Sequence, residues 1–106
     1  MATRIMLVCA AGMSTSLLVT KMEVAAKEAG EEVEIFALPL TEGEKIIDTV
    51  DCVLLGPQVR FQKAAIEKLA AGRKAGDIPY DVIEMKDYGM MNGKAVYEFA
   101  QKLMGR

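Results

Sequence analysis

The stretch that decides the fold is RIMLVCAAGMSTS, residues 4–16, where an apolar run gives way to small and hydroxyl side chains. Residues 5–8 are apolar without interruption, which predicts a short strand over residues 4–8 that is buried on both faces. Beyond the small residues, apolar positions recur at helical spacing. They are Leu18, Met22, Ala25, Ala26 and Ala29. The stretch therefore predicts a strand, a tight loop and an amphipathic helix, which Gly30 ends.

The rest of the chain continues this alternation. Further strands are predicted at residues 33–37, 51–55 and 80–85, and helices at residues 41–50 and 59–71 and in a C-terminal segment. The predicted inward positions of the later helices are Ile46, Val50, Phe61, Ala65, Ile66, Leu69, Val96, Phe99, Ala100 and Leu103. Alternating strands and helices indicate parallel pairing, because parallel strands need helical crossovers. The expected fold is α/β, a single open four-stranded parallel sheet with helices on both faces and a Cys loop at the carboxyl edge of the first strand.

Length and composition bound the class of protein. The chain has 106 residues, 52% of them hydrophobic, and a formal net charge of −2, which indicates one domain over residues 1–106 with an ordinary surface. A nucleic-acid-binding protein would carry a strongly basic face. The longest apolar runs are too short to span a bilayer. We therefore expect no nucleic-acid partner, no direct membrane insertion and a cytoplasmic location.

The chain offers an unusual set of reactive side chains. It has two cysteines, Cys9 and Cys52, and no histidine. Without histidine it lacks the commonest metal ligand and the usual general base, so we expect neither a metal nor a cofactor. In a reducing compartment both thiols should be free. Cys52 lies within an apolar strand and is predicted to be a core residue.

Cys9 stands in a different setting, directly after the first strand. Ligands of open parallel sheets bind outside the carboxyl ends of the strands. A loop of small residues that enters a helix leaves backbone N–H groups unpaired, and these groups form an anion site. Gly12 allows the tight turn, while Ser14, Thr15 and Ser16 add hydroxyl groups and N-cap candidates. Although a lone cysteine is more often a core residue, this loop makes a reactive thiol about equally plausible.

Three motifs give the sequence a family resemblance. They are CAAGMSTSLLV at residues 9–19, VLLGPQ at residues 53–58, and DYG at residues 87–89 followed by Asn92-Gly93. With them the chain resembles the B component of the lactose/cellobiose/chitobiose branch of the bacterial sugar phosphotransferase system. The resemblance extends over nearly the whole chain, and the first motif is the most specific.

This resemblance implies a phosphoryl carrier that spans residues 1–106. Cys9 would accept a phosphoryl group from a phosphohistidine of the A component and pass it to a sugar, expected to be a disaccharide. The sugar would be bound by the membrane-embedded C component, which would recruit the protein to the membrane. The implied phosphoryl cradle consists of Ala10, Ala11, Gly12, Met13, Ser14, Thr15 and Ser16. Gln58 and Tyr88 are possible neighbours of the cradle, although a turn residue and a half-exposed loop aromatic would look the same.

Other protein classes share parts of this pattern. Low-molecular-weight tyrosine phosphatases and related arsenate reductases also place a cysteine before a loop and a helix, but they carry an arginine where this chain has Thr15. That arginine stabilises transition-state charge, so its replacement predicts slow hydrolysis of a phosphocysteine. A flavin-binding module would need aromatic rings, and the chain has no tryptophan and three tyrosines. Met13, Met90 and Met91 could form an apolar docking rim, and Met13→Asp is then predicted to weaken phosphoryl acceptance.

Overall fold

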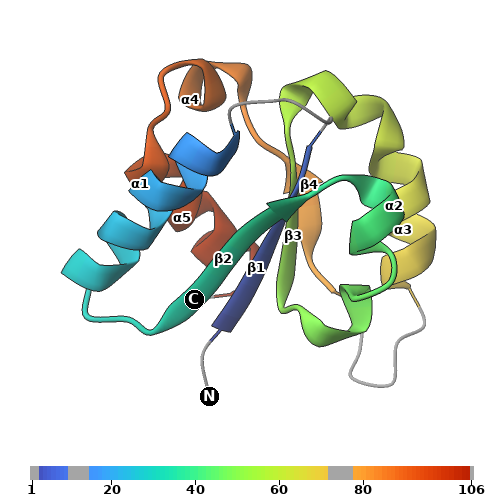
Figure 1. Ribbon diagram of the computed structural model, residues 1–106, viewed down its shortest axis with the longest axis horizontal. Helices are drawn as coiled ribbons and strands as arrows, with labels where there is room; N and C mark the ends of the chain where they lie inside the picture. Colours follow the sequence, from blue (N-terminus) through green and yellow to red (C-terminus); the bar gives the residue numbers. More distant parts are fainter. Residues whose placement is uncertain (1–2, 10–14, 72–77, 106) are drawn as a thin grey trace.

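The computed structural model of the protein describes residues 3–9, 15–71 and 78–105. Within these residues the chain forms a four-stranded sheet in the order β2-β1-β3-β4, with every neighbouring pair parallel (Figure 1). The strands are β1 (Thr3–Val8), β2 (Val33–Leu38), β3 (Cys52–Leu55) and β4 (Tyr80–Val82). The parallel α/β sheet expected from the alternating pattern is confirmed.

The strand register brings all four carboxyl ends to one edge of the sheet. Val8 at the end of β1 pairs with Leu38 in β2 and with Leu55 in β3. Leu55 pairs in turn with Val82, the last residue of β4. Any residue that directly follows a strand therefore lies beside residues that follow the other strands.

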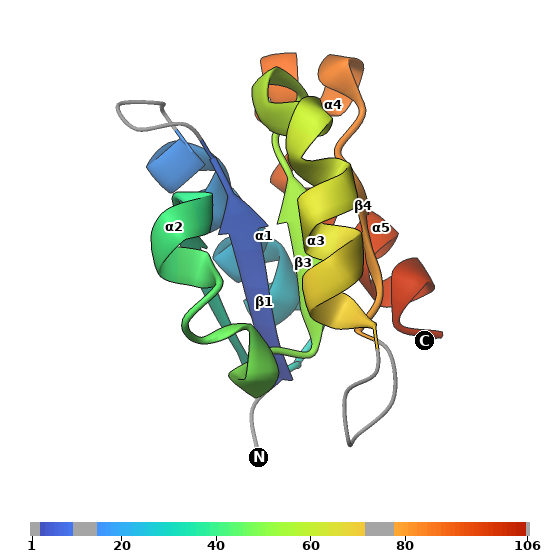
Figure 2. The same cartoon turned by 90° about the vertical axis from the view of Figure 1, so that its right-hand side faces the viewer.

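Helices cover both faces of the sheet, as Figure 2 shows. They are α1 (Thr15–Glu28), α2 (Leu40–Gly43), η1 (Ile47–Thr49), η2 (Pro57–Gln62), α3 (Lys63–Ala70), α4 (Met85–Gly89) and α5 (Gly93–Leu103). Two separate clusters of buried side chains form the core, one on each face. The first cluster, which we call the α1–α5 cluster, consists of Ile5, Leu7, Leu18, Met22, Ala26, Ile35, Cys52, Leu54, Ile83, Tyr88, Val96, Tyr97 and Ala100. The second, on the α2–α3 face, consists of Met6, Val8, Ile47, Val50, Val53, Leu55, Val59, Ile66 and Ile78.

Alternation along the strands explains the division into two clusters. Successive side chains of a strand point to opposite faces of the sheet. Ile5 and Leu7 accordingly lie in the α1–α5 cluster, and Met6 and Val8 lie in the cluster on the other face. All four are fully buried, which confirms that β1 is covered on both sides.

Helix α1 follows the predicted apolar stripe. Leu18, Met22 and Ala26 are buried against the sheet, whereas Ala29 is exposed beyond the end of the helix. Gly30 has a φ of +72° and ends the helix, because that left-handed conformation costs glycine little. The two N-cap candidates that the structure describes, residues 15 and 16, are instead the first two helical residues.

The segment predicted as one helix over residues 41–50 consists of two short pieces. Helix α2 ends at Gly43, and the 3₁₀ turn η1 begins four residues later at Ile47. Gly43 is buried, and a Cβ at this position would lie 3.0 Å from the Met6 sulfur, so the chain approaches the sheet here without a side chain. Ile47 and Val50 are buried, a spacing of three that suits a 3₁₀ turn, whereas the predicted Ile46 is half-buried.

Two inward positions predicted for the third helix are wrong. Phe61 is 75% exposed, and Ala65 is also exposed. The buried stripe is centred on Ile66 instead, with Val59 seven residues earlier on the same face. Pro57–Gln62 forms a separate 3₁₀ segment with a non-helical Val59 (φ −116°, ψ 23°), so the position of Phe61 does not follow the helical spacing of α3.

The segment after β4 is also more ordered than predicted. The strand ends at Val82 rather than at residue 85, and helix α4 includes the first three residues of the loop predicted at residues 87–93. Helices this short carry too few residues to show a periodic pattern. After α4, Met91 has a positive φ of 52°, and the Asn92 side chain caps α5 by accepting a hydrogen bond from the Ala95 N–H at 3.1 Å.

Candidate functional site

The candidate site begins with the row of residues that follows the strands at their carboxyl edge. The Cys9 N–H donates to the Leu38 carbonyl at 3.1 Å, and the Gly56 N–H donates to the Val8 carbonyl at 3.0 Å. The Ile83 N–H donates to the Leu55 carbonyl at 2.8 Å. Backbone pairing therefore continues one residue beyond the strands and holds Cys9, Gly56 and Ile83 in one row, which we call the edge row.

The edge row faces the α1–α5 cluster. Leu7, Leu54 and Ile83 belong to this cluster. Cys9 comes two residues after Leu7. Because side chains alternate along a strand, the two side chains lie on the same face of the sheet. Gly56 likewise comes two residues after Leu54. The thiol of Cys9 is half-buried at this edge, as the sequence predicted from its position after β1.

Helix α1 covers the same face and begins near Cys9 in the chain. Its first residue is Thr15, and Leu18 in its first turn lies in the α1–α5 cluster. The free N–H groups of its first turn and the helix dipole favour an anion at this end. Ser16 is exposed, and its carbonyl accepts a hydrogen bond from the Thr20 hydroxyl at 3.1 Å. The remaining predicted cradle residues, Ala10, Ala11, Gly12, Met13 and Ser14, lie outside the described residues.

Gly56 packs closely against residues that neighbour the edge row. A Cβ at this position would lie 3.1 Å from the Gln58 side-chain oxygen, 3.5 Å from the Tyr88 ring and 3.7 Å from the Val8 carbonyl oxygen. The structure thus brings both predicted neighbours, Gln58 and Tyr88, to the edge row. Gln58 is exposed on η2, directly after the Gly56-Pro57 turn.

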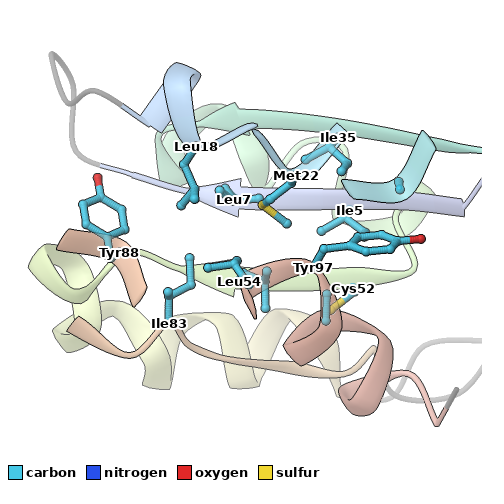
Figure 3. Packing of buried hydrophobic residues seen from close by; sticks show 13 residues of the cluster. Ile5, Leu7, Leu18, Met22, Ile35, Cys52, Leu54, Ile83, Tyr88 and Tyr97 are labelled. Atoms are coloured by element: carbon cyan, nitrogen blue, oxygen red, sulfur yellow. The ribbon is translucent and has the colours of Figure 1, made fainter. Parts of the chain in front are cut away.

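Tyr88 differs from the half-exposed loop aromatic considered from the sequence. It lies on helix α4, is only 5% exposed and packs in the α1–α5 cluster (Figure 3). Its hydroxyl oxygen is fully buried and has no hydrogen-bond partner among the described residues. The sequence could not show this burial, because the glycine that admits the ring is Gly56, far away in the chain.

Cys52 provides a contrast with Cys9, as the sequence predicted. It begins β3, is fully buried and belongs to the α1–α5 cluster. Burial, with a smaller effect of the Asp51 carboxylate, raises the pKa of Cys52 to about 12. Because the thiolate is the nucleophile, this thiol is unreactive at neutral pH.

The described residues offer no obvious place for a metal or a membrane span. Within residues 3–9, 15–71 and 78–105, no three side chains of His, Cys, Asp or Glu are grouped so that they could hold a metal ion. In the same residues, no helix has the length and apolar character needed to cross a bilayer. The nucleophilic side chain that the structure describes at the edge row is the free thiol of Cys9.

Comparison with known proteins places the chain in a family. The family described as the lactose/cellobiose-specific IIB subunit of the phosphotransferase system (PTS) matches residues 4–99. The chain belongs to this family, which confirms the resemblance drawn from the three motifs. The match also favours a carrier over a cysteine phosphatase or arsenate reductase.

Individual relatives cover almost the whole chain. The galactose-specific EIIB component of Lactococcus lactis subsp. cremoris is 47% identical over 94% of both chains. The oligo-beta-mannoside-specific EIIB component of Bacillus subtilis is 45% identical over 95% of both. Among solved structures, the cellobiose-specific IIB component of Borrelia burgdorferi has a TM-score of 0.78 at 39% identity, covering 99% of this chain and 94% of that chain. The lactose-specific IIB domain of Streptococcus pneumoniae shares the fold, with a TM-score of 0.82 at 15% identity over 96% of this chain and 97% of that chain.

Proposed function

We propose that Cys9 carries the phosphoryl group through which this IIB subunit serves a sugar phosphotransferase system. Cys9 accepts the group from a phosphohistidine of the A component and passes it to a sugar bound by the membrane-embedded C component. The protein works in the cytoplasm as a single domain and reaches the membrane through the C component. Three relatives of nearly equal identity are named for galactose, cellobiose and oligo-beta-mannoside, which supports sugar selection by the C component.

The proposed chemistry consists of two displacements at phosphorus. In the first, the Cys9 thiolate attacks the phosphoryl group, the S–P bond forms, and the N–P bond to the donor histidine breaks. In the second, a sugar hydroxyl attacks phosphorus and loses its proton, the O–P bond forms, and the Cys9 thiolate leaves. Phosphoryl transfer depends mainly on positioning and on neutralising charge, which backbone N–H groups at a helix N-terminus supply.

The observation that carries the proposal is that Cys9 lies on the face of the sheet that helix α1 covers, a few residues before this helix begins. Cys9 belongs to the edge row, on the face that α1 covers, and α1 begins six residues later in the chain at Thr15. Helix N-termini favour both a thiolate and a phosphate by roughly 0.3–2 kcal/mol. Cys52 has the same functional group without any of these features and is unsuited to the role.

Exposed apolar side chains surround this edge and suit transient docking of two partners. Leu17 on α1, Phe61 on η2, Met85 on α4 and Met90 directly after α4 are between 50% and 75% exposed. Their elements follow β1, β3 and β4 at the carboxyl edge. Of the three methionines predicted to form a docking rim, Met90 is exposed and Met91 is half-buried against the α1–α5 cluster. The third, Met13, lies outside the described residues.

The test is intact mass after incubation with phosphoenolpyruvate and the phosphotransferase components. Wild type and Cys52→Ser should each gain one phosphoryl group, and Cys9→Ser should gain no thiol-bound group. Acid- and base-stability of the adduct, together with peptide mapping, identifies the bonded atom. Labelling of Cys9→Ser equal to wild type would refute Cys9 as the carrier. Failure of all three variants with proven components would refute the carrier function.

A further inference from the structure

The hydroxyl of Tyr88 is the least explained buried polar group near the edge row. Its oxygen is inaccessible to solvent and lacks a hydrogen-bond partner among the described residues. Buried hydroxyls in native proteins are almost always paired, because an unpaired one forfeits its hydrogen bonds to water. Phenylalanine would fill the same volume without this loss. The hydroxyl is therefore expected to find a hydrogen-bond partner in another state of the protein.

Tyr97 shows how the same cluster treats a tyrosine with a structural role. Its hydroxyl donates a hydrogen bond to the Glu31 carboxylate at 2.8 Å, and Gln101 donates to the same carboxylate oxygen. Figure 3 shows Tyr88 and Tyr97 at opposite ends of the α1–α5 cluster. Of the two tyrosines, Tyr88 lies at the end of the cluster next to the edge row, and its hydroxyl has no partner among residues 3–9, 15–71 and 78–105.

The ring of Tyr88 lies directly over the middle of the edge row. The Tyr88 ring lies 3.5 Å from where a Cβ of Gly56 would stand, and only the Gln58 side-chain oxygen, at 3.1 Å, is nearer to that position. Cys9 is the neighbour of Gly56 in the row, because the Gly56 N–H bonds to the carbonyl of Val8 immediately before Cys9. Neighbouring strands are separated by about 4.8 Å, and both residues face the α1–α5 cluster. Tyr88 is thus one strand away from Cys9 on the face that the thiol shares.

We propose that the Tyr88 hydroxyl donates a hydrogen bond to a phosphoryl oxygen when Cys9 is phosphorylated. This inference rests on the proposed function, since it needs a phosphoryl group on Cys9. A hydroxyl that donates to a phosphate dianion forms a charge-assisted bond, stronger than one between neutral groups. Tyr88 keeps its own proton throughout and takes no part in bond making at phosphorus. It completes, from α4, a set of donors of which the others come from the start of α1.

Tyr88→Phe tests the inference, with Tyr97→Phe as the matched control. Each substitution removes one hydroxyl from the same cluster and leaves the ring in place. The equilibrium of phosphoryl exchange between the A component and this protein should shift away from phosphocysteine by roughly tenfold or more in Tyr88→Phe. It should stay within about twofold of wild type in Tyr97→Phe. The thermal stability of unphosphorylated Tyr88→Phe should equal or exceed that of wild type, because the substitution removes an unpaired buried group.

A second readout separates phosphoryl binding from a structural effect. The ³¹P chemical shift of the phosphocysteine should move in Tyr88→Phe and stay in place in Tyr97→Phe. An unchanged exchange equilibrium and an unchanged ³¹P shift in Tyr88→Phe would overturn the inference while leaving Cys9 as the carrier. Equal changes in both variants would also overturn it. If wild type itself takes up no phosphoryl group, the proposed function fails first, and the two failures are distinguishable.

Discussion

Gly93→Ala tests the packing that holds helix α1 in position at the edge row. Gly93 is the buried first residue of α5. A Cβ at this position would lie 2.4 Å from the Lys21 carbonyl carbon, 2.5 Å from the Lys21 Cβ and 2.7 Å from the Lys21 oxygen. Carbon atoms in contact normally stand about 3.5–4.0 Å apart, so α1 and α5 must separate by roughly 1 Å. The contact is with backbone, which no side-chain rotation can relieve.

The cost follows from two opposing effects. Overpacking a well-packed site typically costs about 1–3 kcal/mol, and a clash with backbone belongs at the upper end of that range. Alanine is a better helix former than glycine by up to about 1 kcal/mol. The free energy of unfolding should therefore fall by about 2 kcal/mol. With an unfolding entropy of about 2.1 cal/mol/K per residue, the midpoint temperature should fall by about 9 °C.

The measurement is urea and thermal unfolding followed by circular dichroism, with Gly89→Ala as the matched control. Gly89 ends helix α4, and a Cβ there would meet nothing within 4 Å. This control should be neutral or stabilised by up to about 1 kcal/mol. A Gly93→Ala protein within about 0.5 kcal/mol of wild type would refute the packing argument. Equal losses in both variants would attribute the effect to glycine as such rather than to the α1–α5 contact.

Other predictions concern the site and its surroundings. Iodoacetamide at pH 8 should alkylate Cys9 in the native protein and should alkylate Cys52 only after unfolding, as measured by peptide mass mapping. Alkylation of Cys52 in the native protein would contradict its burial. Because folding raises the pKa of Cys52 from 9.0 to about 12, the stability due to its neutral thiol is complete below pH 9 and is lost as the pH rises toward 12. The stability difference between wild type and Cys52→Ala should therefore narrow over that interval in urea titrations, and a constant difference would count against the shift. Thr15→Arg should shorten the lifetime of the phosphorylated protein, measured as the decay of the intact-mass adduct, because a guanidinium stabilises the transition state of hydrolysis; an unchanged half-life argues otherwise. Met90→Asp should slow phosphoryl acceptance from the A component by about tenfold, whereas Val24→Asp on α1 should not, although Val24 is also apolar and exposed (52%, against 72% for Met90). Equal rates of the two variants in rapid-quench assays would exclude a docking role for Met90.

The sequence identified the parts of the site that are contiguous in the chain. Residues 4–16 carry the strand, the cysteine and the start of the helix in one uninterrupted stretch, so local patterns suffice to predict them. The core assignment of Cys52 also follows from its local setting within a continuous apolar run. In each case the residues that decide the prediction are close in sequence, and the local apolar pattern indicates whether a side chain is buried.

Patterns failed where several apolar residues competed for one buried stripe or where an element was very short. Phe61 and Ile66 are both apolar, and only the packing of α3 on the sheet decides that Ile66 is buried and Phe61 is exposed. Helix α4 has five residues, too few for a periodic signal, so Met85 was predicted to end a strand and residues 87–89 to begin a loop. The propensity of such segments is weak, and tertiary contacts determine their conformation.

The sequence by itself thus determined the parallel α/β class, the order of its strands along the chain, and the position of Cys9 at the end of the first strand. Tertiary structure alone decided that Gly56, Ile83 and Cys9 share one row. It also decided that Tyr88 packs against this row with a buried hydroxyl that has no hydrogen-bond partner in the described part of the chain. The physical reason is the range of the interactions. Strand and helix periodicity depends on residues that are close in the sequence. The edge row depends instead on the register between strands, which is fixed only when both faces of the sheet are packed.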